Sequence, residues 1–321
     1  MKLIFDLENK EKAQEEFKNV LGFIDAQFEV NALKIELYDA TTELIKIIGK
    51  DTYDYIATLY ADDIEDEKEK FLILKTQSVL AHDAYRKFAP KSDLAVSNQG
   101  RVMRMDEHHK SPFPWMIAAH NESLERTYYK QLDYLIELLD ELNPTVKDSK
   151  KWKDTDHYKN SFSVLFRTAD EFGEFFNISS RYLLMKLSPG IKLALENDIK
   201  PVVGDDELKV YLDELAKDEV SDKRVMHEIK AAAAYSALSW AIKRMSATLF
   251  PEGVLQSYLA NSLDEKQPPD KNEVGVLAHV FEQDAKRALM RLERLFVEEL
   301  EGEEFDPFEI NIHQKDKFID T

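Results

Sequence analysis

The sequence predicts an all-α protein built from two tandem, related helical bundles, with long irregular loops and a short extended C-terminal arm. Three observations support this prediction. Turn-forming residues are scarce, with 9 Gly and 10 Pro among 321 residues, whereas an all-β fold needs them at frequent tight turns. Apolar residues recur at intervals of three and four over most of the chain, which is the spacing of one helix face. The order of segments in the first half also recurs in the second.

The apolar spacing of the first half predicts five helices, of which the first four follow one another closely. Gly49 is expected to end the second helix, because glycine adopts the backbone conformations that close a helix. The fourth begins in an acidic block and is expected to end before Pro90, and Pro144 follows the end of the fifth. Residues 91–114 lack a sustained helical period and predict a long excursion, with a short extended stretch over residues 100–105. The five helices are expected over residues 9–28, 30–48, 52–61, 62–89 and 115–142.

The second half repeats this order after residues 146–160, a polar and charged stretch whose composition is typical of a linker. An apolar helix, a small-residue break at residues 188–190 and a second helix correspond to the segments on either side of Gly49. Long helices follow over residues 225–250 and 280–302. Residue identity between the halves is low, so the alternative that any two helical bundles would look alike stays open. The predicted domains span residues 1–145 and 161–304, and an extended tail spans residues 305–321.

The composition excludes several classes of chemistry and partner. The chain has no cysteine, which rules out disulfides, cysteine-based zinc sites, thiol nucleophiles and iron–sulfur clusters. Its 62 acidic and 43 basic residues give a net charge of -19, so nucleic acid and anionic lipid would be repelled. No apolar run approaches the roughly 20 residues of a membrane span, and the N-terminus has no signal-peptide core. We expect a cytoplasmic protein that binds neither nucleic acid nor membrane.

The motifs of the common enzyme classes are missing from the sequence. It contains no phosphate-binding loop, dinucleotide fingerprint, HExxH motif, nucleophile elbow or EF-hand loop. Residues 106–109 are four consecutive potential metal ligands, but adjacent side chains point in different directions and a solvated loop is the ordinary explanation. His227 with Glu228 and His279 with Glu282 lack the second motif of a di-iron site. We predict no catalytic residue, cofactor or metal site.

Two apolar segments are the candidate partner interface. Phe113 and Trp115 belong to the stiff sequence PFPW, which forms an apolar knob at the exit of a polar loop. Packing of this loop onto its own domain is an equally good explanation. The tail contains the alternating sequence FEINIH, which could add a strand to a partner's sheet. The tail residues that we assign to the interface are Phe305, Phe308, Ile310 and Ile312.

Four segments of the first half carry a resemblance to known proteins. They are ELIKIIGKDTYDYI, LAHDAYRKFAP, DLAVSNQGRVMRMDEHHKSPFPWM and LERTYYKQLDYLIELLDEL. In them the chain resembles an uncharacterised family found in phages and prophages of Bacteroides and related bacteria, in structural gene neighbourhoods. The pattern is also similar to the small helical head–tail connector (adaptor) proteins of tailed phages, which assemble into a ring under the portal. The resemblance covers most of residues 30–142 and reaches the second half only through the repeat.

The resemblance implies a structural protein of the phage neck, made in the host bacterial cytoplasm. It would form a homo-oligomeric ring that contacts portal and tail proteins, and genomic DNA would pass through as cargo that is not bound. Two other classes stay open. A non-enzymatic phage assembly chaperone or interaction module would bind a subunit and leave, whereas an all-α enzyme with an unrecognised site would show a polar pocket with strongly perturbed carboxylates.

Overall fold

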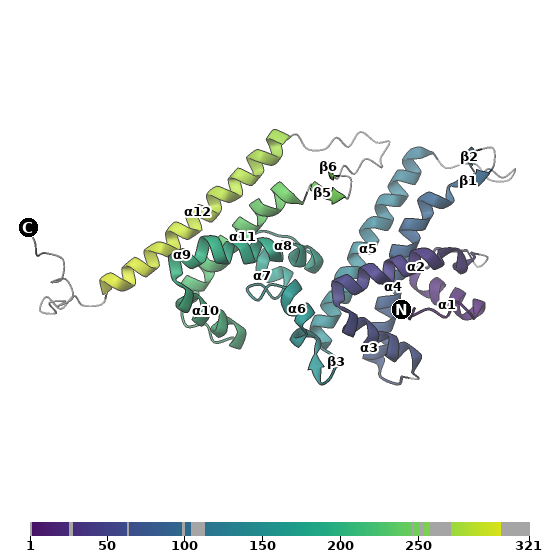
Figure 1. The fold of residues 1–321 in the computed structure, drawn as a ribbon, viewed down its shortest axis with the longest axis horizontal. Coiled ribbons are helices and arrows are strands. Elements are labelled where there is room, and N and C mark those ends of the chain that lie inside the picture. Colours follow the sequence, from purple (N-terminus) through teal and green to yellow (C-terminus); the bar gives the residue numbers. More distant parts are fainter. Residues whose placement is uncertain are drawn as a thin grey trace, which may run out of the picture.

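The computed structural model describes residues 2–25, 28–62, 64–97, 100–103, 113–245, 247–250, 253–256 and 271–302. It confirms the all-α class, because only three two-stranded sheets accompany the helices within these residues. Two helical units lie side by side in Figure 1, the first at the right and the second at the left. Each unit contains a pair of long helices with a β-hairpin at the upper end of the pair.

The first unit is built around three helices whose apolar faces meet. Leu44, Leu80 and Leu135 come from these three helices, and all are almost completely buried. The helical spacing of the sequence places such residues on one face, so burying that face stabilises each helix. The elements of this unit are α1 (Lys10–Leu21), the 3-10 turn η1 (Val30–Leu33), α2 (Lys34–Ile48), α3 (Lys50–Ala61), α4 (Glu67–Ser92), β1 (Leu94–Ser97), β2 (Gly100–Met103) and α5 (Pro114–Leu142), with α2, α4 and α5 forming the centre.

The segment expected to be a linker, residues 146–160, packs onto the first unit instead. It lies within the short elements β3 (Thr145–Lys147), β4 (Lys150–Lys151), η2 (Trp152–Asp154) and α6 (Asp156–Ser161). Trp152 is completely buried in the first core, and its indole N–H donates to the carbonyl of Ile48 at 3.4 Å. A single buried indole ring removes a large apolar surface from water, so it anchors this segment despite the polar composition around it.

The second unit has its own core, formed where α8 (Arg181–Ala194), α11 (Lys223–Arg244) and α12 (Lys271–Gly302) meet. Ile191, Ile229 and Leu292 are completely buried there. The alanines at positions 231–234 are also buried, and such small side chains allow the close helix approach that the sequence suggested. The elements of this unit are α7 (Ala169–Gly173), α8 (Arg181–Ala194), the π-helical turn η3 (Leu195–Ile199), α9 (Lys200–Val203), α10 (Asp205–Lys217), α11 (Lys223–Arg244), β5 (Ala247–Phe250), β6 (Gly253–Gln256) and α12 (Lys271–Gly302).

Several predicted helix boundaries were wrong. α1 ends at Leu21, where Gly22 closes it with φ 70°, and not near residue 28. α12 begins at Lys271 and not at residue 280.

α4 continues through Pro90 to Ser92. The proline lacks one backbone N–H donor, and only two residues of the helix follow it. The helix expected over residues 225–250 ends at Arg244, and residues 247–250, which were expected to be helical, form strand β5. The break expected at residues 188–190 lies inside α8.

Gly204 in the second unit has nearly the same backbone conformation as Gly49 in the first. Gly49 has φ 87° and ψ 150° between α2 and α3, and Gly204 has φ 95° and ψ 153° between α9 and α10. The long helices α4 and α11 also begin alike: Asp66 and Asp222 each accept two backbone N–H groups, at 2.7 and 3.3 Å in both cases. These matched points support an internal duplication, which stays a prediction.

Candidate functional site

Large apolar side chains are exposed at the N-terminal end of α5. Phe113 is 65% exposed, Trp115 61% and Met116 45%, and we call these three residues the α5 knob. Phe113 is the N-cap residue, with φ -67° and ψ 148°, and Pro114 follows at the first helical position, where its fixed φ suits a helix start. The sequence predicted Phe113 and Trp115 as interface residues. The structure shows them exposed, and their contact with a partner stays a prediction.

A second exposed apolar group lies near the N-terminal end of α12. Val276 is 66% exposed, Leu277 49% and Val280 48%, and we call these residues the α12 patch. Sequence reasoning missed them, because valine and leucine on an amphipathic helix are expected to face the core. The sequence signal that could have identified them is that they lie between residues of the buried helix face, such as Ala278 and Phe281.

The α5 knob and the α12 patch lie at the same edge of the molecule. In Figure 1 the N-terminal ends of α5 and α12 both point to the upper edge, where the hairpins β1–β2 and β5–β6 also lie. Groups of exposed apolar side chains typically mark protein–protein contacts. The arrangement therefore makes this edge the candidate functional surface of the described chain.

An apolar groove opens on the second unit between α8 and α11. It has a volume of about 420 Å³, and Leu187 and Leu238 form part of its wall. Phe176 and Met245 line it as well, and each is 44% exposed. Sequence reasoning did not identify this groove, since its walls come from helices about fifty residues apart in the chain. Its lining suits apolar contacts and offers few groups for polar chemistry.

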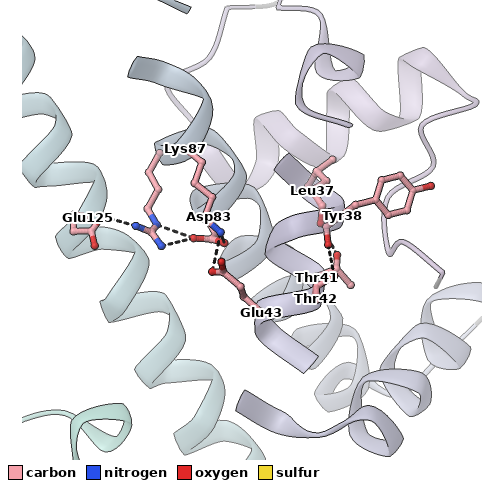
Figure 2. Close-up of polar contacts among 9 residues, drawn as sticks. Leu37, Tyr38, Thr41, Thr42, Glu43, Asp83, Lys87 and Glu125 are labelled. Carbon is pink, nitrogen blue, oxygen red and sulfur yellow. Dashed lines mark hydrogen bonds and ion pairs between the residues drawn. The ribbon is translucent and has the colours of Figure 1, made fainter. Parts of the chain in front are cut away.

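The most buried charge of the first unit is the carboxylate of Asp83 on α4, whose side chain is 2% exposed. It accepts hydrogen bonds from Nε of Arg86 at 2.7 Å and from Nζ of Lys87 at 2.6 Å. Arg86 also donates to Glu125 on α5 at 2.6 Å, and Lys87 donates to Glu43 on α2 at 2.8 Å (Figure 2). Because each charge has a partner of opposite sign, this cluster ties three helices together.

Other polar groups beside this cluster are satisfied within their own helices. The hydroxyls of Thr41 and Thr42 donate to carbonyls one turn earlier in α2, at 2.7 and 2.9 Å (Figure 2). His82 is buried, and its Nδ1 lies 2.7 Å from the carbonyl oxygen of Ser78. Burial lowers the pKa of His82, which favours the neutral ring with Nδ1–H as donor. These groups have structural contacts that explain their presence.

A second charged cluster joins the two units, where α5 meets α8. Arg181, which is buried at the start of α8, donates from Nε to Asp140 of α5 at 2.8 Å and from Nη2 to the Tyr158 hydroxyl at 3.2 Å. Its guanidinium lies 4.4 Å from the centre of the Phe162 ring. Its Nη1 has no hydrogen-bond partner among the described residues. The cluster links the second unit to the first through both charge and ring contacts.

A carboxylate of α5 caps the start of α8 beside Arg181. Asp133 accepts hydrogen bonds from the backbone N–H of Tyr182 at 2.8 Å and from the hydroxyl of Ser180 at 3.0 Å. Burial raises the pKa of Asp133 by more than these hydrogen bonds lower it. Burial also raises the pKa of Glu137, and the negative charges of Asp133 and nearby carboxylates add to this effect. Raised carboxyl pKa values here follow from the packing of the two units.

The candidate metal ligands do not form a site in the described residues. No group of three or more His, Asp or Glu side chains there could hold a metal ion. His279 pairs with Glu282 at 3.6 Å, and His227 packs against the Phe175 ring. Two of the sequence predictions fall outside the described residues. They concern the potential metal ligands at residues 106–109 and the interface residues Phe305, Phe308, Ile310 and Ile312 of the tail. Among the described helices, none is both long enough and apolar enough to span a bilayer.

Comparison with protein families gives a match over most of the chain. The sequence model of DUF6712, a family of unknown function, matches residues 30–160 and 199–301. No curated protein and no solved structure matches the chain.

Proposed function

The chain belongs to the DUF6712 family of unknown function, and we propose that it is a head–tail connector of a tailed phage. In this role it is a structural subunit of the virion neck. Copies assemble into a ring between portal and tail, and the genome passes through the ring. The resemblance of residues 30–142 to small helical connectors supports this proposal.

The observation that carries the proposal is the pair of similar helical units that expose apolar side chains at one edge. The α5 knob and the α12 patch belong to different units, and the N-terminal ends of the helices that carry them both point to the upper edge in Figure 1. A chain with two such surfaces can contact neighbours at both, as a ring subunit must. The clusters around Asp83 and Arg181 join helices of the same chain, which supports a structural role for these charges.

The acidity of the chain fits a ring through which DNA passes. A net charge of -19 on each copy would repel the phosphate backbone and keep the genome from adhering to the wall. In the assembled ring, the acidic residues would accordingly face the channel. A channel wall rich in Lys and Arg would contradict this part of the proposal.

The proposal is tested by the native mass of the purified chain and by its presence in particles. We expect light scattering to give a mass several times 37.3 kDa and electron microscopy to show closed rings. In cells infected by a phage that encodes the chain, it should purify with finished particles and lie at the neck. A stable monomer that is absent from finished particles would contradict the connector proposal and favour an assembly chaperone.

A further inference from the structure

The two β-hairpins of the chain have the same geometry. In the first, Leu94 pairs with Met103 and Ser97 with Gly100, and in the second, Ala247 pairs with Gln256 and Phe250 with Gly253. Each hairpin thus has two antiparallel strands of four residues, joined by two residues. Each also follows one long helix of its unit and precedes the other. The two hairpins are therefore matched in length, direction and place.

Neither hairpin is part of a larger sheet within the described residues. Each forms a separate two-stranded sheet, so the outer edge of every strand lacks a strand partner in the described chain. A two-stranded hairpin is marginally stable in water, and three or more strands are typically needed for stability. The hairpins would gain backbone hydrogen bonds if further strands paired with them.

The composition of the strands does not protect their edges. Charged residues make up 33% of the chain, yet Arg101 is the single charged residue in β1, β2, β5 and β6. Soluble proteins usually protect exposed strand edges with charged residues, especially lysine, or with proline, because an unprotected edge can pair with another chain. Here the strand sequences LAVS, GRVM, ATLF and GVLQ are suited to pairing.

The helices that follow the two hairpins carry exposed apolar residues near their N-terminal ends. The α5 knob lies at the start of the helix after β2, and the α12 patch lies near the start of the helix after β6. The N-terminal ends of α5 and α12 both lie toward the edge where the hairpins are found (Figure 1). A partner that pairs with the strands would cover these side chains as well.

We propose that the β1–β2 hairpin of one copy pairs edge to edge with the β5–β6 hairpin of the next copy. The occupant of each hairpin edge is thus a second copy of this chain, because the other hairpin of the same sequence has strands of matching length. This inference rests on the proposed ring and gives it a specific contact. Since the two hairpins belong to different units, the contact is head-to-tail, and it propagates from copy to copy until a ring closes.

Single-cysteine variants test this contact, because the natural chain has no cysteine. Ala95→Cys or Val102→Cys marks the first hairpin, and Thr248→Cys or Leu255→Cys marks the second; each pair occupies opposite positions in its hairpin. Each first-hairpin variant is mixed with each second-hairpin variant and oxidised mildly. We expect disulfide-linked dimers from at least one of the four mixtures, and not from either of its variants alone. Val210→Cys, on an exposed residue of α10, is the control and should give no link.

The outcomes separate this inference from the connector proposal. Closed rings without any link in the four mixtures would overturn the hairpin contact and leave the connector proposal standing. Linked open filaments would support the hairpin contact and contradict a closed ring. A link formed by one variant alone would show a two-fold contact and overturn the head-to-tail arrangement. A monomer without links would overturn both.

Discussion

At the scale of single residues, Asp83 shows how the first unit uses a buried charge. Its carboxylate is nearly inaccessible, whereas the partners Arg86 and Lys87 keep about a fifth of their side chains exposed. Removing one member of a buried ion pair leaves the others without compensation, and this is more costly than replacing the whole cluster by apolar groups. Removing the charge of Asp83 should therefore reduce the stability of the fold more than removing the charge of an exposed acid near it.

We expect Asp83→Asn to lower the free energy of unfolding by up to about 3 kcal/mol, because Arg86 and Lys87 lose the buried carboxylate that they share and each keeps one exposed acidic partner. Urea unfolding followed by circular dichroism measures this loss. Asp54→Asn is the matched control, since Asp54 pairs with Lys50 on the surface with a side chain 55% exposed, and such pairs contribute less than about 1 kcal/mol. Equal losses in the two variants would show that burial does not set the cost.

At the scale of elements, Gly190 explains why α8 does not break where small residues occur. A Cβ atom at Gly190 would lie 2.9 Å from the Trp240 ring and 3.2 Å from Cα of Ala237. The glycine thus lets α11 approach α8 closely, and helix packing maintains α8 through Pro189. By contrast, Gly204 has a positive φ and forms the actual boundary between helices.

Gly190→Ala is expected to destabilise the second unit by about 1 to 3 kcal/mol, because the added methyl group overpacks the contact with Trp240. Gly275→Ala is the matched control. Gly275 lies in α12 with no atom within 4 Å of its Cβ position, so alanine should stabilise the helix by about 0.5 to 1 kcal/mol. Thermal unfolding of both variants gives opposite shifts if close packing is the reason for Gly190. A gain in both would indicate that α8 and α11 separate easily.

The same elements show what sequence patterns can and cannot predict. Apolar spacing located the long helices, and Gly49 marked a true boundary, because these signals are local. The role of Gly190 depends on Trp240, fifty positions later, and the burial of Trp152 depends on α2; neither contact has a local signal. Phe113 and Trp115 were predicted as exposed candidates because PFPW stiffens the helix start, whereas the α12 patch resembles an ordinary apolar face.

In the molecule as a whole, the two units meet at a junction where burial disfavours the ionised form of a carboxyl group. Asp133 caps the start of α8 from α5 and so joins the units. Burial raises its pKa, so the folded state holds the proton more tightly than the unfolded chain. Its contribution to stability is then complete below the unfolded pKa and is lost as the pH rises through the folded pKa. Ionised Asp133 thus weakens the junction at neutral pH relative to acid pH.

Asp133→Asn keeps an oxygen that can accept from Tyr182 and Ser180 and removes the charge. We expect this variant to be more stable than the natural chain at pH 7. The difference should shrink as the pH falls toward 3.8, the ordinary pKa of aspartate, because both chains then carry a neutral group. Unfolding at a series of pH values measures the difference. Asp206→Asn controls for the loss of one negative charge, since Asp206 is 95% exposed on α10. If Asp133→Asn is less stable at pH 7, the carboxylate charge strengthens the junction, and the charge on α5 helps hold the two units together.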